Sequence, residues 1–245
     1  MQFIVRPARI AAFLAAVVGL LTLANVVLLL LKHRWGHDTV FGLVRLFDVN
    51  EEANVPSFYS ACGLLLCACL LGLIARHTWD QRDRWRRHWA GLSLIFLFLA
   101  TDEAAQIHEM LDPLLRKLLH ASGPLFFAWV IPYSVLMLIF AVTYFRFWWA
   151  LPARIRWLLG VAGVVYVFGA MGLEFVGSAL VSSHGGDAGG IQDWRHAISY
   201  SFEEFFEMAG VVIAVYALLC HFEEQRITLS ARVSSDPRAA PMTDT

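Results

Sequence analysis

Long apolar runs, each separated from the next by a short polar segment, dominate this sequence. Six of them reach the roughly 20 residues that a helix needs to cross a hydrocarbon core of about 30 Å. They cover approximately residues 10–32, 57–76, 88–109, 124–147, 156–181 and 199–221. No segment shows the apolar–polar alternation, about ten residues long, of a membrane barrel strand. The pattern therefore predicts an all-α fold, a polytopic bundle of about six transmembrane helices.

Composition supports this class. Hydrophobic residues make up 58% of the chain, charged residues make up 16%, and the mean hydropathy is +0.60. We expect one transmembrane domain over residues 1–222 and a disordered cytoplasmic tail over residues 223–245, which is polar and contains two prolines. The apolar stretch after Arg9 is too long for a signal peptide, so we interpret it as an uncleaved anchor.

The distribution of basic residues predicts the orientation, because Arg and Lys near helix ends are retained in the cytoplasm. If the N-terminus is cytoplasmic, 13 of the 19 Arg and Lys fall on that side. The acids show the opposite bias, with 14 of 20 on the outer side or in the outer half of a helix. We therefore expect a multi-pass protein of the inner (plasma) membrane with both termini in the cytoplasm.

Three further segments predict local structure. Residues 41–47 suggest a short amphipathic helix on the outer interface, and residues 184–190 form a Gly-rich, flexible loop. The acids at 51 and 52, followed by Pro56, suit a well-formed helix start. All four cysteines fall within predicted helices, so we interpret them as packing residues rather than as disulfide partners.

The end of the third helix carries polar residues that membrane helices seldom contain. At about 100° per residue, Asp102, Gln106 and Glu109 share one face, whereas His108 lies farther round and could join them only because it is near the helix end. A polar end turn in water would explain Glu109. It explains Asp102 less well, because this residue lies deeper.

Glu174 is the one acid in the fifth apolar run. Gly163, Ala170 and Gly177 lie on the same face of that helix, and small residues mark the face that packs closely against neighbouring helices. Glu174 should therefore point into the bundle, either in a functional role or in a structural hydrogen bond to another helix.

The sixth helix begins with a second group of acids. Glu204 and Glu207 are three residues apart and can reach the same point, and Glu203 lies nearby on the helix surface. A helix start favoured by the dipole would account for Glu203 and Glu204 better than for Glu207.

The predicted orientation brings these groups to one outward-facing pocket. Several carboxylates so close together cannot all be ionised, so they must share protons or hold a cation. We predict Asp102 and Glu174 as catalytic acid–base groups. A divalent metal, Zn, Mn or Fe, would have these predicted ligands: His108, Glu109, Glu204 and Glu207.

The ligand pattern departs from known spacings. The helical di-metal bundle uses Glu-x-x-His, whereas His108 follows Glu103 by five residues. His33 and His37 have i, i+4 spacing at the end of the first helix and form an alternative ligand pair, which Gly36 between them weakens.

Three segments resemble motifs of uncharacterised multi-pass bacterial membrane proteins: Glu52-Ala-Asn-Val-Pro-Ser, Asp102-Glu-Ala-Ala-Gln-Ile-His-Glu109 and Glu203-Glu-Phe-Phe-Glu-Met208. A looser likeness is to the alkaline ceramidase and adiponectin-receptor-like hydrolases, whose zinc sites combine a Ser, an Asp and three His. Those proteins have His-x-x-x-His in the last helix, where this sequence has Glu204 and Glu207.

These observations predict a metal-binding, membrane-embedded enzyme, hydrolase-like, with membrane lipids around it and a lipid or small molecule as substrate. Nucleic acid is not expected as a partner. A proton- or cation-coupled transporter is the alternative, although no internal repeat supports the inverted-repeat plan of many carriers. A structural or partner-binding membrane protein is the third possibility.

Overall fold

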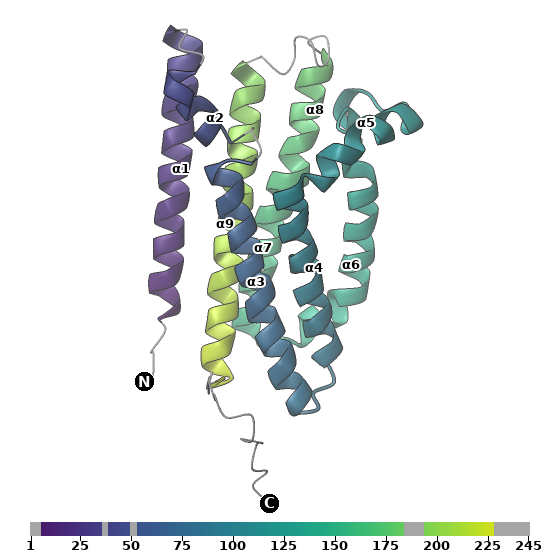
Figure 1. Cartoon of the computed structure of the whole chain (residues 1–245). Helices are drawn as coiled ribbons and strands as arrows, with labels where there is room; N and C mark the ends of the chain where they lie inside the picture. Colours follow the sequence, from purple (N-terminus) through teal and green to yellow (C-terminus); the bar gives the residue numbers. More distant parts are fainter. Residues whose placement is uncertain (1–5, 36–38, 50–52, 184–193, 228–245) are drawn as a thin grey trace, which may run out of the picture.

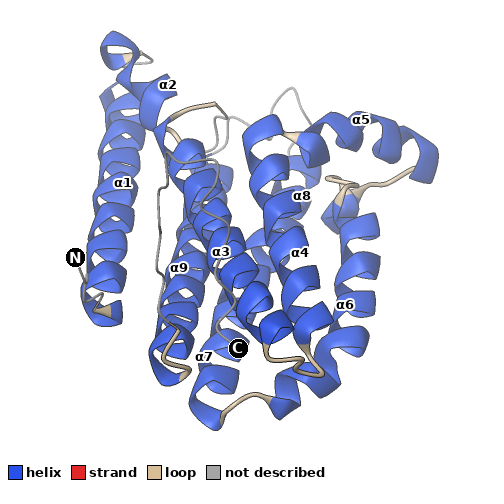
Figure 2. Ribbon diagram, turned by 60° about the horizontal axis from the view of Figure 1, so that its bottom comes forward, coloured by secondary structure: helices blue, strands red, loops and turns tan. Residues whose placement is uncertain are grey.

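A computed structural model describes residues 6–35, 39–49, 53–183 and 194–227, and helices form every regular element of these residues (Figures 1 and 2). In chain order the elements are α1 (Pro7–Trp35), η1 (Val40–Gly42), α2 (Leu43–Phe47), α3 (Val55–Asp80), α4 (Arg86–Ala105), α5 (Ile107–Leu119), η2 (Gly123–Leu125), α6 (Val130–Ala150), α7 (Ala153–Val167), η3 (Phe168–Leu173), α8 (Glu174–Ser183) and α9 (Trp194–Glu224). The predicted all-α fold is confirmed.

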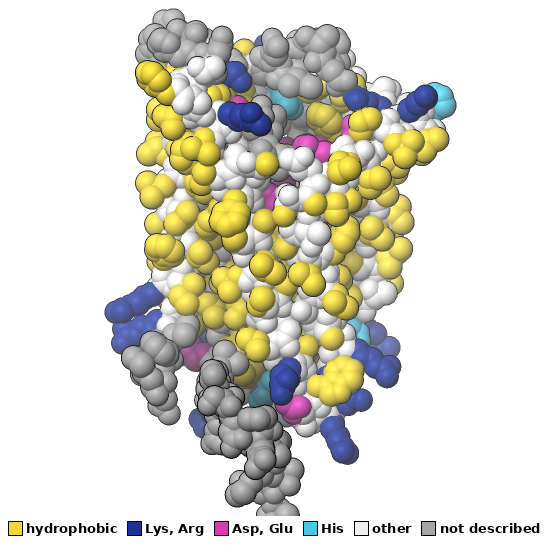
Figure 3. Space-filling view, in the orientation of Figure 1, with side chains coloured by type: hydrophobic (Ala, Val, Ile, Leu, Met, Phe, Trp, Pro, Cys, Tyr) yellow, Lys and Arg dark blue, Asp and Glu magenta, His cyan; other side chains and the backbone are white. Residues whose placement is uncertain are grey.

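Several helices are long and apolar enough to cross a membrane, as the apolar pattern predicts. Five helices are long and apolar enough to cross a membrane: α1, α3, α6, the continuous α7–η3–α8 helix and α9. The pair α4 and α5 makes a sixth span if its two bent parts are counted together. Figure 3 shows many hydrophobic side chains across the middle of the face in view, as expected for a surface that faces acyl chains.

Helix α9 lies at the centre of the bundle and packs against α1, α3, α7, η3 and α8. Its face toward α3 and α7 supplies Val215 and Leu218, which are buried in the main core with Leu71, Ile74 and Ile155. Close packing needs a small residue at the α7 contact. A Cβ added to Gly210 would lie 2.8 Å from the backbone nitrogen of Tyr166.

The two ends of the bundle differ in charge. Helix α1 begins and α9 ends at the same end, where the α3–α4 connection carries Arg82 and Arg84 and the start of α7 carries Arg154 and Arg156 (Figure 1). We call this the basic end. The opposite end holds α2, α5 and the acids described below, and we call it the acidic end.

The third predicted helix does not continue through residue 109. Gln106 adopts a left-handed backbone conformation (φ 58°), which ends α4 at Ala105 and turns α5 by 79°. The predicted shared face of Asp102, Gln106 and Glu109 is therefore wrong, because the 100° step does not carry across the break. Helix α5 is amphipathic, with Met110 among its exposed apolar residues and Asp112 buried.

Two local predictions agree with the structure. Part of the segment 41–47 forms the short helix α2, and α3 starts with a capping box in which Asn54 and Ser57 bond each other's backbone N–H groups. Pro56 occupies the first turn, so the start of α3 has a sufficient structural explanation.

Other predictions are only partly tested. All four cysteines are free thiols, as expected. The acids at 51 and 52, the loop at 184–190, the tail from residue 228 onward and the side chains of His33 and His37 lie outside the described part of the chain. Helix α9 extends to Glu224, slightly beyond the predicted start of the tail at residue 223.

We predict that Gly210→Ala destabilises the bundle by about 1–3 kcal/mol, because the methyl group would press on the backbone of α7. Gly19→Ala is the matched control, since a Cβ there has no atom within 4 Å. Alanine in a helix should leave the stability of that variant unchanged or slightly higher. Thermal unfolding of both purified variants measures the difference. Equal melting temperatures would contradict the close α7–α9 contact.

Candidate functional site

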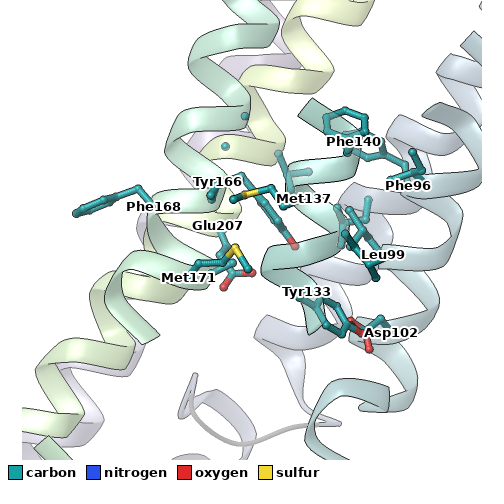
Figure 4. A pocket seen from close by; sticks show the side chains of 18 of the residues that line it. Phe96, Leu99, Asp102, Tyr133, Met137, Phe140, Tyr166, Phe168, Met171 and Glu207 are labelled. Atoms are coloured by element: carbon teal, nitrogen blue, oxygen red, sulfur yellow. Dashed lines mark hydrogen bonds between the residues drawn. The ribbon is translucent and has the colours of Figure 1, made fainter. Parts of the chain in front are cut away.

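A cavity of about 1600 Å³ lies between α4 and α6 on one side and α7, η3 and α9 on the other. Figure 4 shows Phe96 and Leu99 on one wall and Tyr166 and Glu207 on the other. Apolar side chains line most of its length. Polar side chains gather toward the acidic end, where Asp102 stands in the last turn of α4.

Asp102 is buried, with 5% of its surface exposed, and it is the acceptor in a compact hydrogen-bonded group. Its Oδ1 accepts from the backbone N–H of His108 at 2.9 Å, and its Oδ2 lies 3.3 Å from His108 Nδ1. Tyr133 Oη donates to Oδ2 at 2.9 Å (Figure 4). The left-handed residue Gln106 produces this geometry, because it bends the chain by 79° and places His108 beside the end of α4.

Aromatic rings from the start of α6 enclose the imidazole. The His108 ring lies 4.8 Å from the Trp129 ring and 6.4 Å from the Tyr133 ring, measured between centroids. Trp129 also reaches the next helix, since its Nε1 donates to Glu174 Oε1 at 2.9 Å. Trp129 thus contacts both His108 and Glu174, which come from elements far apart in sequence.

The Glu174 carboxyl group also lies within hydrogen-bonding reach of the Glu203 carboxyl group on α9. A hydrogen bond between two carboxyl groups contains one proton, so the pair avoids placing two full negative charges side by side. A π-helix, η3, precedes Glu174, and such wide turns often occur at functional sites. Gly169 within it allows close approach to α9, because an added Cβ would lie 2.7 Å from the Glu203 carbonyl oxygen.

Asp112 has a structural explanation of its own. It is buried in α5 and accepts hydrogen bonds from the backbone N–H groups of Ala128 and Trp129. Arg116, one turn later, lies 3.9 Å from its second oxygen. Asp112 therefore holds the segment that leads into α6 and positions Trp129 beside the site.

The structure brings all six predicted site residues to the lining of this cavity: Asp102, His108, Glu109, Glu174, Glu204 and Glu207. Their contacts and exposure differ. Asp102 contacts His108 directly, and Glu174 pairs with Glu203, which was not among the predicted site residues. Glu109 is exposed on α5, whereas Glu204 and Glu207 are partly buried on α9.

The structure does not support the predicted metal site. Within the described residues, no three His, Cys, Asp or Glu side chains are arranged to hold a metal ion. The best candidate donors bind each other instead: Asp102 with His108, and Glu174 with Trp129 and Glu203. The residues as arranged do not fit a metal.

Sequence reasoning missed Trp129, Tyr133 and Glu203. Trp129 and Tyr133 are four residues apart at the start of a span, a spacing that places two aromatic rings on one face. Aromatic residues at the start of a span are also typical of an interfacial anchor, so the spacing alone does not identify a site. Glu203 was attributed to a favourable helix start, and only the position of η3 against α9 shows its pairing with Glu174.

We predict that Asp112→Ala destabilises the protein by about 1–3 kcal/mol, because two buried backbone N–H groups would lose their acceptor. Met110→Ala on the exposed face of the same helix is the control and should change stability little. Chemical or thermal unfolding of the two variants measures the effect. If Asp112→Ala were as stable as the control, Asp112 would have no such supporting role.

The comparisons with known proteins place the chain in a family without assigning an activity. No curated protein and no solved structure matches it. A family model described as "Domain of unknown function (DUF8692)" matches residues 8–222, which includes every helix that contributes to the cavity. The chain therefore belongs to the DUF8692 family.

Proposed function

We propose that this protein is a membrane-embedded enzyme that performs hydrolase-like acid–base chemistry on an amphiphilic substrate. The observation that carries this proposal is the Asp102–His108–Tyr133 group at the polar end of a largely apolar cavity. The volume of about 1600 Å³ exceeds the roughly 300–1,000 Å³ usual for small-molecule sites, which favours a lipid-sized ligand.

His108 would act as the general base. In the tautomer that donates from Nδ1 to Asp102 Oδ2, the lone pair is on Nε2, which can take a proton from water as the water oxygen attacks an acyl carbon. Asp102 stabilises the resulting imidazolium and keeps the ring oriented. The imidazolium then returns the proton to the leaving group, so the acid and the protonated leaving group are the products.

Three contacts prepare Asp102 for this role. The His108 backbone N–H and the Tyr133 hydroxyl occupy its oxygens together with the imidazole, so its orientation is set before substrate binds. Preorganised groups of this kind need not rearrange during the reaction. Trp129 packs against the imidazole and restricts its ring.

We predict that Asp102→Asn and His108→Ala each lower kcat by roughly 10²–10⁴-fold, the usual contribution of a general base. Fluorogenic long-chain esters and amides in detergent or nanodiscs provide the assay. His77→Ala is the control, since His77 bonds Gln81 at the basic end, away from the cavity. Unchanged activity in both Asp102→Asn and His108→Ala would contradict the enzyme proposal.

The Glu174–Glu203 pair favours a second candidate function, a proton- or cation-coupled transporter. A proton shared between two partly buried carboxyl groups can be released and regained, which is a property of proton carriers. Liposomes containing the protein distinguish the two. A transporter would lose coupled proton uptake in Glu203→Gln and show no hydrolysis, whereas an enzyme would hydrolyse substrate without an ion gradient.

The charge difference between the two ends supports an orientation. We place the basic end in the cytoplasm of a cell whose inner (plasma) membrane holds the protein, because Arg and Lys near helix ends favour that side. Both termini would then be cytoplasmic, and the acidic end would face outward. Substrate would meet the polar part of the cavity near the outer leaflet.

We expect a single cysteine introduced at position 84, in the α3–α4 connection, to be labelled by a membrane-impermeant maleimide only after the membrane is opened. A cysteine at Lys117 on α5 should be labelled in intact cells. Both variants require a background in which the four native cysteines are replaced. The reverse labelling pattern would invert the topology and put the site near the cytoplasmic leaflet.

A further inference from the structure

The middle of α6 packs loosely against the rest of the bundle. All nine residues from 135 to 143 are exposed, and at about 100° per residue they cover every direction around the helix. One side faces outward and the other faces the cavity, which Leu136, Met137 and Phe140 line. The middle of α6 therefore forms a loosely packed wall of the cavity.

Contacts at its two ends hold α6 in place. At the acidic end Trp129 and Tyr133 bond Glu174 and Asp102. At the basic end Phe147 is buried and stacks with His88. Tyr133 and Phe147 are fourteen residues apart, which is about 21 Å along the helix. Residues over this whole length line the cavity. The space is long enough for an extended aliphatic chain.

The wall opposite α6 leaves room for such a chain. Gly163 of α7 lines the cavity, and a Cβ added to it would have no atom within 4 Å. The sequence placed Gly163 on a close-packing face, but no helix fills that position. A ligand, rather than a neighbouring helix, suits this open surface.

The charge of the side chains at the polar end of the cavity determines which head group a bound amphiphile can have. The described residues that line the cavity include eight carboxyl residues and two histidines, but no Lys or Arg: Asp102, Glu103, Glu109, Asp112, Glu174, Glu203, Glu204, Glu207, His108 and His196. An anionic head group would meet like charge there. A cation would be attracted to it, and Trp129 and Tyr133 present aromatic rings that also favour cations.

We propose that the cavity binds a single-chain amphiphile with a protonated amine head group, taken laterally from the bilayer past the middle of α6. The ammonium group lies at the acidic end beside Glu174 and Glu203, and the chain extends toward Phe147. This inference rests on the proposed function for the site of the reaction, and it names the class of substrate that the site accepts.

The test uses the full chain in nanodiscs and three probes of equal chain length: hexadecylamine, hexadecanol and hexadecanoic acid. Quenching or enhancement of tryptophan fluorescence, together with native mass spectrometry, reports binding. We expect the amine to bind at least about tenfold more tightly than the acid, with the alcohol between them. Equal affinities for the amine and the acid would overturn the charge argument.

Two pairs of variants separate the head-group site from the chain site. Glu203→Gln should weaken amine binding by about tenfold and leave alcohol binding unchanged, whereas Glu224→Gln at the basic end should affect neither. Gly163→Phe should weaken all three probes by filling the chain site, whereas Gly19→Phe, on an exposed surface of α1, should not. Glu174→Gln provides a second head-group variant if Glu203→Gln does not fold.

The outcomes distinguish this inference from the proposed function. Amine binding with no hydrolysis would support the ligand class and contradict the enzyme. Hydrolysis of neutral substrates that depends on His108, with no preference for amines, would support the enzyme and contradict the ligand class. Normal binding of all three probes by Gly163→Phe would show that the cavity is not the chain site. Cross-linking through α6 that showed this helix buried in a dimer would also contradict the proposed entry of lipid past α6.

Discussion

A carboxyl group inside an apolar bundle must be protonated, hydrogen-bonded or paired, because an isolated charge there costs several kcal/mol. This constraint explains the arrangement of the acidic end. Asp102 meets three donors, and Glu174 meets Trp129 and a second carboxyl. These bonds tie α4, α5, α6, α8 and α9 together around one cavity. The groups that could perform chemistry also determine how the helices are joined.

Two backbone irregularities make this arrangement possible. The left-handed residue Gln106 ends α4 and brings His108 back to Asp102, which a straight helix would keep about a turn and a half apart. The π-helix η3 widens the helix immediately before Glu174, and Gly169 brings it against Glu203. Strained or widened turns at such points are common where a protein must aim side chains rather than maximise stability.

The cavity combines a large, mostly apolar space with a group of polar side chains at one end. Helix α6 has firm contacts at both ends, whereas its middle, residues 135–143, is exposed, so one wall of the largely apolar cavity is loosely packed. A protein that only needed stability would close this space, since unfilled volume forfeits packing energy. The polar groups gather at one end of it, as binding a molecule with one polar end requires.

Sequence alone determined the helical fold and the number of apolar segments, because each span must satisfy its backbone within itself and the apolar pattern follows chain position directly. It also identified the unusual acids, since charge within a span is visible without coordinates. It failed at residues 106–109, where the helical phase was continued across a break that a single left-handed residue creates. It could not show that Asp102 pairs with Tyr133, or Glu174 with Trp129 and Glu203, because those contacts join residues 29 to 45 positions apart. Which carboxyls share a proton, and which only begin a helix, depends on how the helices pack, and the tertiary structure alone decided it.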